Sequence, residues 1–176
     1  TMLNFVGRMS GIATRTAEFV AAVAGTRATV LDTRKTTPGL RALEKYAVRC
    51  GGGTNHRIGL FDAMLVKDNH VAGLAPAAMA ARVAEAARRA RARHALAFVE
   101  VECDDLEQFR AIVALPAGTV DIALLDNMGL DALRACVALR DASAPALKLE
   151  ASGGVRLETV RAIAETRSDL DARLAA

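Results

Sequence analysis

Short apolar runs and longer amphipathic segments alternate along the chain. The short runs predict buried strands, and the longer segments, with apolar residues every three or four positions, predict helices. The expected strands lie at residues 28–32, 63–67, 98–103, 120–125 and 147–151. The expected helices lie at residues 3–24 (in two parts around Ser10-Gly11), 38–50, 75–93, 106–114, 130–142 and 157–165. This alternation predicts an α/β fold with a parallel sheet, because each crossover helix must pack back onto the sheet.

Composition supports a single ordinary domain and excludes several function classes. Hydrophobic residues make up 52% of the 176 residues, enough for a core, while aromatic residues make up only 3%. A nucleic-acid-binding module would need a dense basic stripe with stacking aromatics. The Arg-rich run at residues 82–93 is therefore interpreted as a solvated helix face, and no nucleic-acid partner is expected.

Cysteine usage and hydropathy bear on location. Cys50, Cys103 and Cys136 are far apart and form no CxxC pair, so they are expected to be reduced, small buried residues rather than zinc ligands. No apolar run approaches the roughly 20 residues that a membrane span needs, and no signal peptide is recognised. A cytoplasmic protein without a membrane partner is expected.

Basic side chains follow three successive predicted elements. Arg34 and Lys35 come after the strand at 28–32, His56 and Arg57 follow a triple-glycine turn, and Lys67 ends the next strand. Parallel strands bring their carboxyl ends to one face, where loops build the site. The cluster predicts a ligand with several negative charges, and the alternative for any single member is a solvated surface charge. His56 alone could equally be a polar residue that holds its loop.

Acidic side chains end the next two strands. Glu102 ends the strand at 98–103 and Asp126 follows the strand at 120–125, so both carboxylates should reach the same rim. Glu100 lies two residues before Glu102 and on the same side, where a structural carboxylate is at least as good an interpretation. Asp104 and Asp105 are predicted to cap the following helix. Asn127 is a weaker site candidate.

The Ser152-Gly153-Gly154 turn follows the strand at 147–151 and precedes a helix. Such a turn can present backbone N–H groups to an anion. An isolated Ser-Gly-Gly sequence is also typical of a plain turn, so only the surrounding motifs can distinguish an anion-binding turn from a plain one. Glu150 lies near enough to the strand end to reach the site.

The motifs DTRKTTPGLR, EKYAVRCGGGTNHR, KDNH, VEVEC, LLDN and LEASGG occur in this order. Together they resemble the C-terminal domain of quinolinate phosphoribosyltransferases, over nearly the whole chain. The resemblance implies an open or partial parallel α/β barrel. Residues 1–25 would be a helical lead-in, residues 26–166 the incomplete catalytic barrel, and residues 167–176 a polar tail foreign to the family.

The resemblance also implies roles for individual residues. Lys35, Glu102 and Asp126 would be catalytic, and Glu102 and Asp126 would hold Mg²⁺ directly or through water. The implied substrate-binding residues are Thr33, Arg34, Lys35, His56, Arg57, Lys67, Glu102, Asp126, Ser152, Gly153 and Gly154. The basic members would bind quinolinate, and the Ser-Gly-Gly turn would bind the 5′-phosphate.

The implied reaction transfers a phosphoribosyl group from phosphoribosyl pyrophosphate to quinolinate. The products would be nicotinate mononucleotide, pyrophosphate and CO₂, in the biosynthesis of NAD, and family members are homodimers or larger. Two alternatives stay open. One is an inactive fragment that binds anions or the parent subunit, and the other is a ModD-type relative. The KDNH and EKYAV motifs favour the quinolinate enzyme.

The chain departs from the family pattern at both ends. In the family pattern an N-terminal sandwich domain precedes the barrel, and we expect this sequence to lack it. The segment Arg167-Ser168-Asp169-Leu170-Asp171-Ala172-Arg173 is expected to replace the family's final strand. We therefore expect a barrel that is one strand short and open at that edge. An incomplete 5′-phosphate site and weak turnover are the expected consequences.

Overall fold

A curled parallel sheet forms the centre of the molecule. The computed structural model describes residues 2–166 and the backbone of residues 171–173. The sheet contains six strands in the order β1-β6-β5-β4-β3-β2, and every pairing is parallel. The strands are β1 (Val30–Leu31), β2 (Met64–Val66), β3 (Val99–Cys103), β4 (Ile122–Asp126), β5 (Lys148–Ser152) and β6 (Asp171–Arg173). The predicted open α/β barrel is confirmed.

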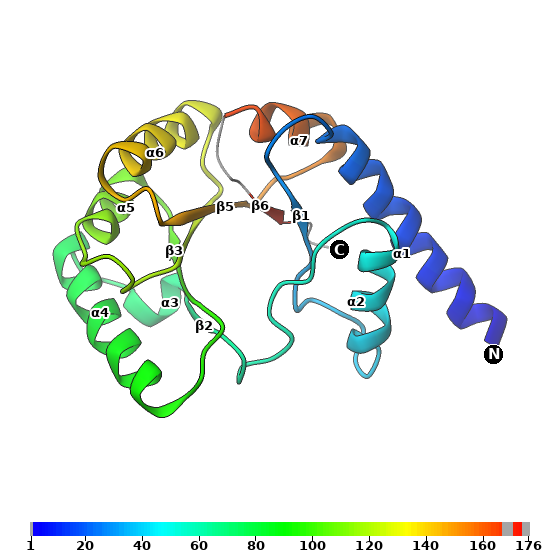
Figure 1. Ribbon diagram of the computed structural model, residues 1–176, viewed down its shortest axis with the longest axis horizontal. Coiled ribbons are helices and arrows are strands. Elements are labelled where there is room, and N and C mark those ends of the chain that lie inside the picture. The colour runs from blue at the N-terminus through cyan, green and yellow to red at the C-terminus, as the bar shows by residue number, and fades with distance from the viewer. Residues whose placement is uncertain (1, 167–170, 174–176) are drawn as a thin grey trace.

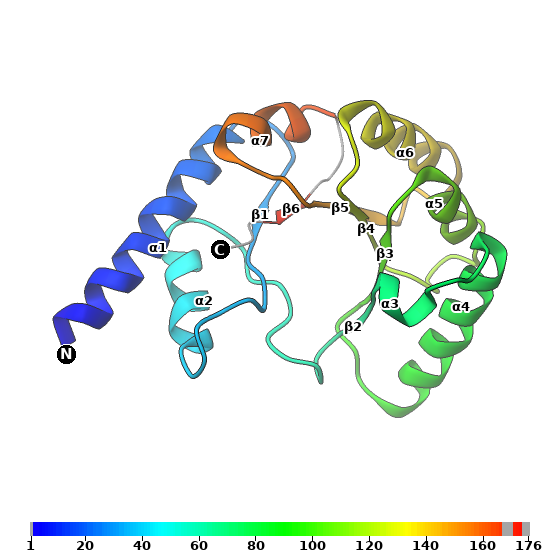
Figure 2. The same ribbon diagram turned by 180° about the vertical axis from the view of Figure 1, so that it is seen from behind.

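Helices cover the outside of the curled sheet. They are α1 (Met2–Ala22), α2 (Arg41–Cys50), α3 (Asp68–Val71), α4 (Pro76–Arg93), α5 (Leu106–Val113), α6 (Leu130–Ser143) and α7 (Leu157–Ala164). Figures 1 and 2 show α1, α7, α6, α5 and α4 as an arc around the strands. Within the described part of the chain, no helix combines the length and apolar character that a membrane crossing requires.

Alternate residues of β3 face two different environments. Val99, Val101 and Cys103 belong to the main apolar core under the helices. Glu100 and Glu102 are also buried, at 0% and 7% exposure, and lie on the opposite side of the strand, inside the barrel. The barrel interior therefore contains buried carboxylates beside apolar residues such as Leu124. Buried carboxylates on a strand are unusual and point to a functional use.

The sheet is open between β1 and β2. These are the two edge strands among the described residues, and the segment with residues 51–63 runs between them (Figure 1). This segment adds a short parallel bridge to β1, in which Thr54 N donates to Val30 O at 2.8 Å and Asp32 N donates to Thr54 O at 3.1 Å. The bridge brings the loop that carries His56 and Arg57 to the end of β1.

Two helix boundaries differ from the sequence prediction. α1 is one continuous helix, because Gly11 costs about 1 kcal/mol in a helix but does not have to break it. α2 begins at Arg41 and not at Pro38, because Gly39 adopts a positive φ of 78° and turns the chain first. The short helix α3 was not predicted at all.

The C-terminal tail contributes a strand, so the prediction that residues 167–173 contain none was wrong. β6 pairs with β1 on one side and with β5 on the other. A slot between two parallel strands offers hydrogen-bonding groups on both sides, so the backbone of a polar segment can pair there whatever its side chains. The opening lies instead between β1 and β2. Residues 167–170 and 174–176 lie outside the described residues.

One cysteine should react much faster than the other two with a thiol reagent at pH 8. Cys50 is exposed, which corrects the prediction that all three are buried, whereas Cys103 and Cys136 are buried. Burial raises the pKa of the Cys136 thiol to about 11 and raises the pKa of Cys103 as well, so few thiolates form there. Titration with a chromogenic disulfide should give one fast equivalent, and the other two only in denaturant. Three fast equivalents would contradict this burial.

Candidate functional site

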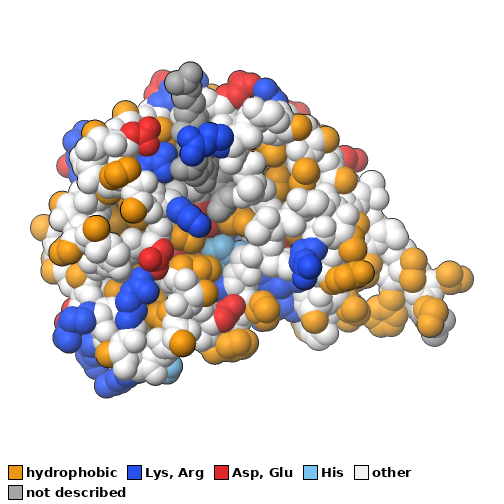
Figure 3. All heavy atoms as spheres, in the orientation of Figure 1, with side chains coloured by type: hydrophobic (Ala, Val, Ile, Leu, Met, Phe, Trp, Pro, Cys, Tyr) orange, Lys and Arg blue, Asp and Glu red, His pale blue; other side chains and the backbone are white. Residues whose placement is uncertain are grey.

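The predicted site residues all line one cavity at the carboxyl ends of the strands. The cavity has a volume of about 570 Å³. It is lined by Thr33, Arg34, Lys35, His56, Arg57, Leu65, Lys67, Glu102, Leu124, Asp126, Asn127, Ser152, Gly153, Gly154 and Val155. Figure 3 shows a hollow in the face of the molecule, with a histidine side chain inside it and charged side chains nearby. The structure therefore brings together residues from six separate segments.

One side of the cavity is cationic. Arg34 and Lys35 follow β1, His56 and Arg57 lie on the loop after α2, and Lys67 follows β2. The Nε atom of Arg34 is buried and makes no hydrogen bond to the part of the chain that the structure describes. A buried guanidinium donor without an acceptor is costly. A bound anion at this position would supply the acceptor.

The loop after Arg57 is braced by Asp62. Its two carboxylate oxygens accept from the backbone N–H groups of Ile58 at 2.6 Å and Gly59 at 2.9 Å. Partial burial would raise the pKa of Asp62, but these backbone hydrogen bonds outweigh it and hold the pKa below its ordinary value. The Nη1 atom of Arg57 donates to Ala63 O at 3.2 Å, which fixes the arginine along the same loop.

The opposite side of the cavity is acidic. Glu102, Asp104 and Asp126 each place a carboxylate oxygen within 4.8 Å of the others. The Asp105 side chain caps α5 by accepting from Gln108 N at 2.8 Å, and Gln108 Oε1 accepts in return from Asp104 N at 2.9 Å. Asp104 thus shares the cap, as was predicted, through its backbone and not through its carboxylate. Asp104 does not line the cavity but lies beside the two carboxylates that do. Sequence reasoning missed this neighbour, although its position two residues after Glu102 was a usable signal.

Sheet register explains how the two sides meet. Val66 of β2 pairs with Val101 of β3, so Lys67 and Glu102 are the next neighbours across the strands. Lys67 Nζ lies 2.7 Å from Glu102 Oε2, with Lys67 half exposed and Glu102 buried. This ion pair keeps one Glu102 oxygen occupied and joins the cationic side of the cavity to the acidic side.

The glycine turn closes the cavity next to Asp126. Ser152 pairs with Asp126 in the register of β4 and β5, and Asn127 N donates to Ser152 O at 2.8 Å. Gly153 and Gly154 both have positive φ, at 82° and 63°. Backbone N–H groups in such a turn can bind an anion. Asn127 also has a positive φ and donates to Asp126 Oδ2 at 2.6 Å, so it orients a site carboxylate.

Replacing Gly153 with alanine should destabilise the protein more than the same change at Gly154. A Cβ atom at Gly153 would lie 2.1 Å from Asn127 Oδ1 and 2.9 Å from Asn127 N, whereas nothing lies within 4 Å of a Cβ at Gly154. Both variants carry the strain of a positive φ, about 1–3 kcal/mol, and only the first adds a clash. Chemical denaturation of both variants measures the difference, and equal losses would refute the close packing of Asn127 on the turn.

A buried polar cluster lies beside the cavity in the barrel interior. The Nε2 atom of His56 lies 3.1 Å from Glu100 Oε2 and 3.5 Å from Glu150 Oε2. The His56 ring also packs against Phe98, with 4.8 Å between centroids. His56 is thus both a cavity residue and a structural one. Glu100 and Glu150 do not line the cavity, and His56 links both of them to it.

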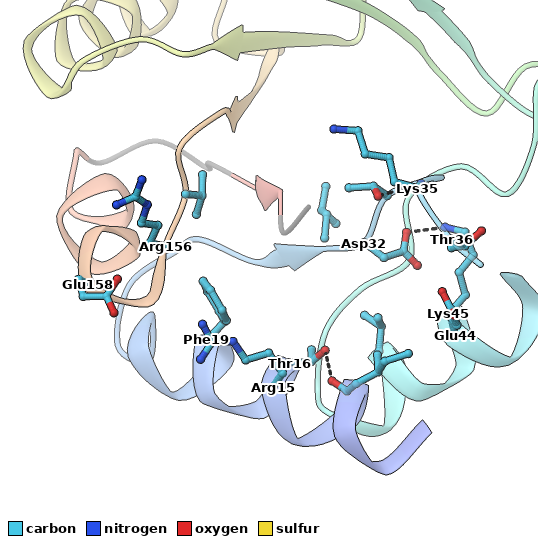
Figure 4. Close-up of a pocket in the computed structure, with 15 residues that line it drawn as sticks. Arg15, Thr16, Phe19, Asp32, Lys35, Thr36, Glu44, Lys45, Arg156 and Glu158 are labelled. Carbon is cyan, nitrogen blue, oxygen red and sulfur yellow. Dashed lines mark hydrogen bonds and ion pairs between the residues drawn. The ribbon is translucent and has the colours of Figure 1, made fainter. Parts of the chain in front are cut away.

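A second cavity of about 460 Å³ adjoins the first and shares Thr33, Lys35 and Val155 with it. Its walls come from α1, α2, the end of β1 and the turn before α7 (Figure 4). Asp32 and Lys45 line this second cavity and do not line the first.

Comparison with known proteins agrees with this geometry. Residues 12–171 match the family described as "Quinolinate phosphoribosyl transferase, C-terminal domain". The carboxylating nicotinate-nucleotide pyrophosphorylase of Mycobacterium leprae is 49% identical over 169 residues, which are 96% of this chain and 56% of that protein. A probable enzyme of the same name from Bacillus subtilis is 43% identical over 94% of this chain and 53% of its own length. The chain spans about half the length of the curated relatives it matches.

Solved structures give the same result. The nicotinate-nucleotide pyrophosphorylase of Ehrlichia chaffeensis superposes with a TM-score of 0.81 at 38% identity, covering 97% of this chain and 58% of that one. The nicotinate-nucleotide pyrophosphorylase of Francisella tularensis superposes with a TM-score of 0.79 at 37% identity, covering 95% of this chain and 55% of that one. The resemblance inferred from the motifs is confirmed. The chain belongs to the family of quinolinate phosphoribosyltransferase C-terminal domains.

Proposed function

We propose that this cavity binds quinolinate and phosphoribosyl pyrophosphate and transfers the phosphoribosyl group with decarboxylation. The products would be nicotinate mononucleotide, pyrophosphate and CO₂, a step toward NAD. The observation that carries the proposal is the meeting of a cationic and an acidic side in one cavity, with Arg34 Nε buried and without an acceptor among the described residues. The family membership of the chain supports the same reaction.

The cationic side suits a pyridine with two carboxylates. Arginine offers a planar fork that matches a carboxylate bidentately, and lysine adds a compact charge. In this proposal Arg34 and Arg57 hold the two carboxylates, and Lys35, Lys67 and His56 complete the positive field. Binding would place the ring nitrogen toward the acidic side, a positioning contribution to the rate.

The acidic side suits Mg²⁺. Glu102, Asp104 and Asp126 offer hard carboxylate oxygens within 4.8 Å of one another, which is the ligand type that this cation prefers. In this proposal Glu102 and Asp126 hold the ion, directly or through water, with Asp104 beside them. When bound there, Mg²⁺ supplies positive charge that stabilises the pyrophosphate leaving group.

The transfer itself needs no nucleophilic side chain. The bond between C1 of the ribose and the pyrophosphate oxygen breaks, and the quinolinate nitrogen forms a new bond to C1. Positive charge develops on the ribose as this happens, and the carboxylates of Glu102 and Asp126 would stabilise it. The bond between C2 and the 2-carboxylate then breaks and CO₂ leaves, while the electron pair of that bond stays on C2. The adjacent cationic ring nitrogen stabilises this pair until a proton adds to C2. The 5′-phosphate would rest on the turn of Ser152, Gly153 and Gly154.

The proposal includes association into a homodimer or larger assembly in the cytoplasm. Apolar side chains at the start of α1 support association, since Met2 and Leu3 are 80% and 84% exposed (Figure 3). Free thiols in the described structure fit a reducing compartment. Light scattering of the chain at several concentrations tests the first point.

Calorimetric titration with quinolinate tests the proposed function. We expect binding by the unmodified chain, at least tenfold weaker binding of nicotinate, which has one carboxylate, and loss of quinolinate binding in Arg34→Ala. The loss follows because a charge-assisted contact to a carboxylate is worth about 1.5–3 kcal/mol. Arg110→Ala, an exposed change on α5, is the matched control and should bind as the parent does. Equal binding by Arg34→Ala and the parent would contradict the proposal.

A further inference from the structure

A buried network joins three segments of the cationic side below the cavity. Asp32 Oδ1 accepts from Lys45 Nζ and, at 2.9 Å, from the backbone N–H of His56. Asp32 Oδ2 accepts from Asn55 Nδ2 at 2.6 Å. Lys45 Nζ also donates to His56 O at 3.2 Å, and Asn55 Nδ2 donates to Lys45 O at 2.9 Å. We refer to Asp32, Lys45 and Asn55 as the clamp.

The clamp begins where backbone pairing with β1 ends. Thr54 is the loop residue that pairs with the β1 segment through its backbone, with its N–H bound to Val30 O and its C=O to Asp32 N. The next two residues, Asn55 and His56, are held by side chains of the clamp. The N–H of His56 is bound to Asp32 and its C=O to Lys45, so both backbone groups of this residue are fixed by one ion pair.

Burial makes the clamp rigid. The side chains of Lys45 and Asp32 are 5% and 6% exposed, and Figure 4 shows Lys45 reaching from α2 toward Asp32 at the end of β1. Buried charges persist only when their hydrogen bonds are satisfied, so such a pair tolerates little displacement of either partner. The loop bearing His56 and Arg57 is therefore tied to the segment bearing Arg34 and Lys35.

We propose that Asp32, Lys45 and Asn55 are positioning residues that set the distance between the Arg34–Lys35 segment and the His56–Arg57 loop. This role rests on the proposed function, in which the Arg34–Lys35 segment and the His56–Arg57 loop bind the two carboxylates of one ligand. The clamp does not line the main cavity, so it acts through the residues it holds. Its loss should lower affinity for a two-carboxylate ligand more than for a one-carboxylate ligand.

The test uses the full chain and two readouts. Lys45→Met removes the ammonium group but keeps the length of the side chain. The double variant Asp32→Asn with Lys45→Met removes both buried charges. It replaces Lys45→Met in the test if that single variant does not fold. Leu133→Ala, a buried change on α6, is the control for general destabilisation. Amide hydrogen exchange measures how firmly the loop is held in the absence of a ligand. Calorimetry measures the affinities for quinolinate and nicotinate, at a temperature where all variants are folded.

We expect the amide of His56 to exchange at least tenfold faster in the clamp variants, while the amide of Thr54, bound to Val30 O, changes far less. Quinolinate affinity should fall by about tenfold to a hundredfold, and the preference over nicotinate should shrink. Leu133→Ala should keep the parent's affinity and its preference.

Two results would overturn the proposal. One is a folded clamp variant with the parent's His56 exchange rate and quinolinate affinity. The other is an equal loss of affinity in Leu133→Ala, because the loss would then follow from stability alone. Failure of the unmodified chain to bind quinolinate would refute the proposed function instead, and the exchange of His56 relative to Thr54 would still decide whether the clamp holds the loop.

Discussion

Changing Glu102 to glutamine is expected to slow phosphoribosyl transfer by about a hundredfold to a thousandfold, the usual effect of removing one group that stabilises transition-state charge. Glu102 is 7% exposed and lies on the acidic side of the cavity with Asp126, and the carboxylate of Asp104 lies beside them. Glutamine keeps the shape and can still contact Lys67, but it lacks the negative charge that opposes the cationic ribose. Quinolinate affinity should change only a fewfold, because the proposed binding mode places the dicarboxylate on the other side of the cavity.

The measurement is the initial rate with saturating substrates and Mg²⁺, relative to the unmodified chain. Glu107→Gln is the matched control, since the same change falls on an exposed side chain of α5, five residues along the chain. Binding of Mn²⁺, followed by its electron paramagnetic resonance, gives a second readout that needs no turnover, and it should weaken in Glu102→Gln only. An unchanged rate and unchanged Mn²⁺ binding would remove Glu102 from the proposed chemistry.

The cationic side of the site could be predicted because its residues follow strands. Once the alternating pattern indicates a parallel sheet, residues after β1 and β2 must reach the same face, whatever the exact strand boundaries. Arg34, Lys35 and Lys67 needed no further information. His56 and Arg57 lie on a loop after the triple-glycine turn, and their place after a predicted element put them in the cationic cluster. The motif resemblance then implied that they bind quinolinate.

The residues that were missed depend on contacts between distant segments. Asp104 follows β3 and was assigned to a helix cap, because the sequence does not say which of two neighbouring aspartates turns toward Gln108. Lys45 lies on an amphipathic helix where a lysine predicts a solvated face, yet its Nζ is buried against Asp32. Only the packing of α2 against the end of β1 determines that outcome.

The tail was mispredicted for a different reason. A polar segment gives no strand signal of its own, because strand periodicity reads which side chains are buried. The pairing of β6 with β1 and β5 follows from the slot between those strands, which exists only in the folded sheet. Backbone hydrogen bonding therefore makes this segment a strand, although its side-chain pattern does not predict one.

Truncating Phe109 to alanine is expected to lower the free energy of unfolding by about 3–5 kcal/mol, the usual range for a buried phenylalanine. Phe109 is fully buried on α5 and belongs to the main core together with Val99 and Val101 of β3. The lost contacts lie directly behind the strand whose other face presents Glu100 and Glu102. Urea denaturation followed by circular dichroism measures the change as a shift of the midpoint at constant slope.

Phe61→Ala is the matched control, because Phe61 is 77% exposed on the loop before β2. The same truncation there removes little buried surface, so the free energy of unfolding should fall by less than about 0.5 kcal/mol. A large loss in Phe61→Ala would mean that this apolar loop is covered in solution, and its dependence on protein concentration would then identify association between chains. A small loss in Phe109→Ala would instead contradict the packing of α5 against β3, and with it the support that holds Glu102 at the rim of the barrel.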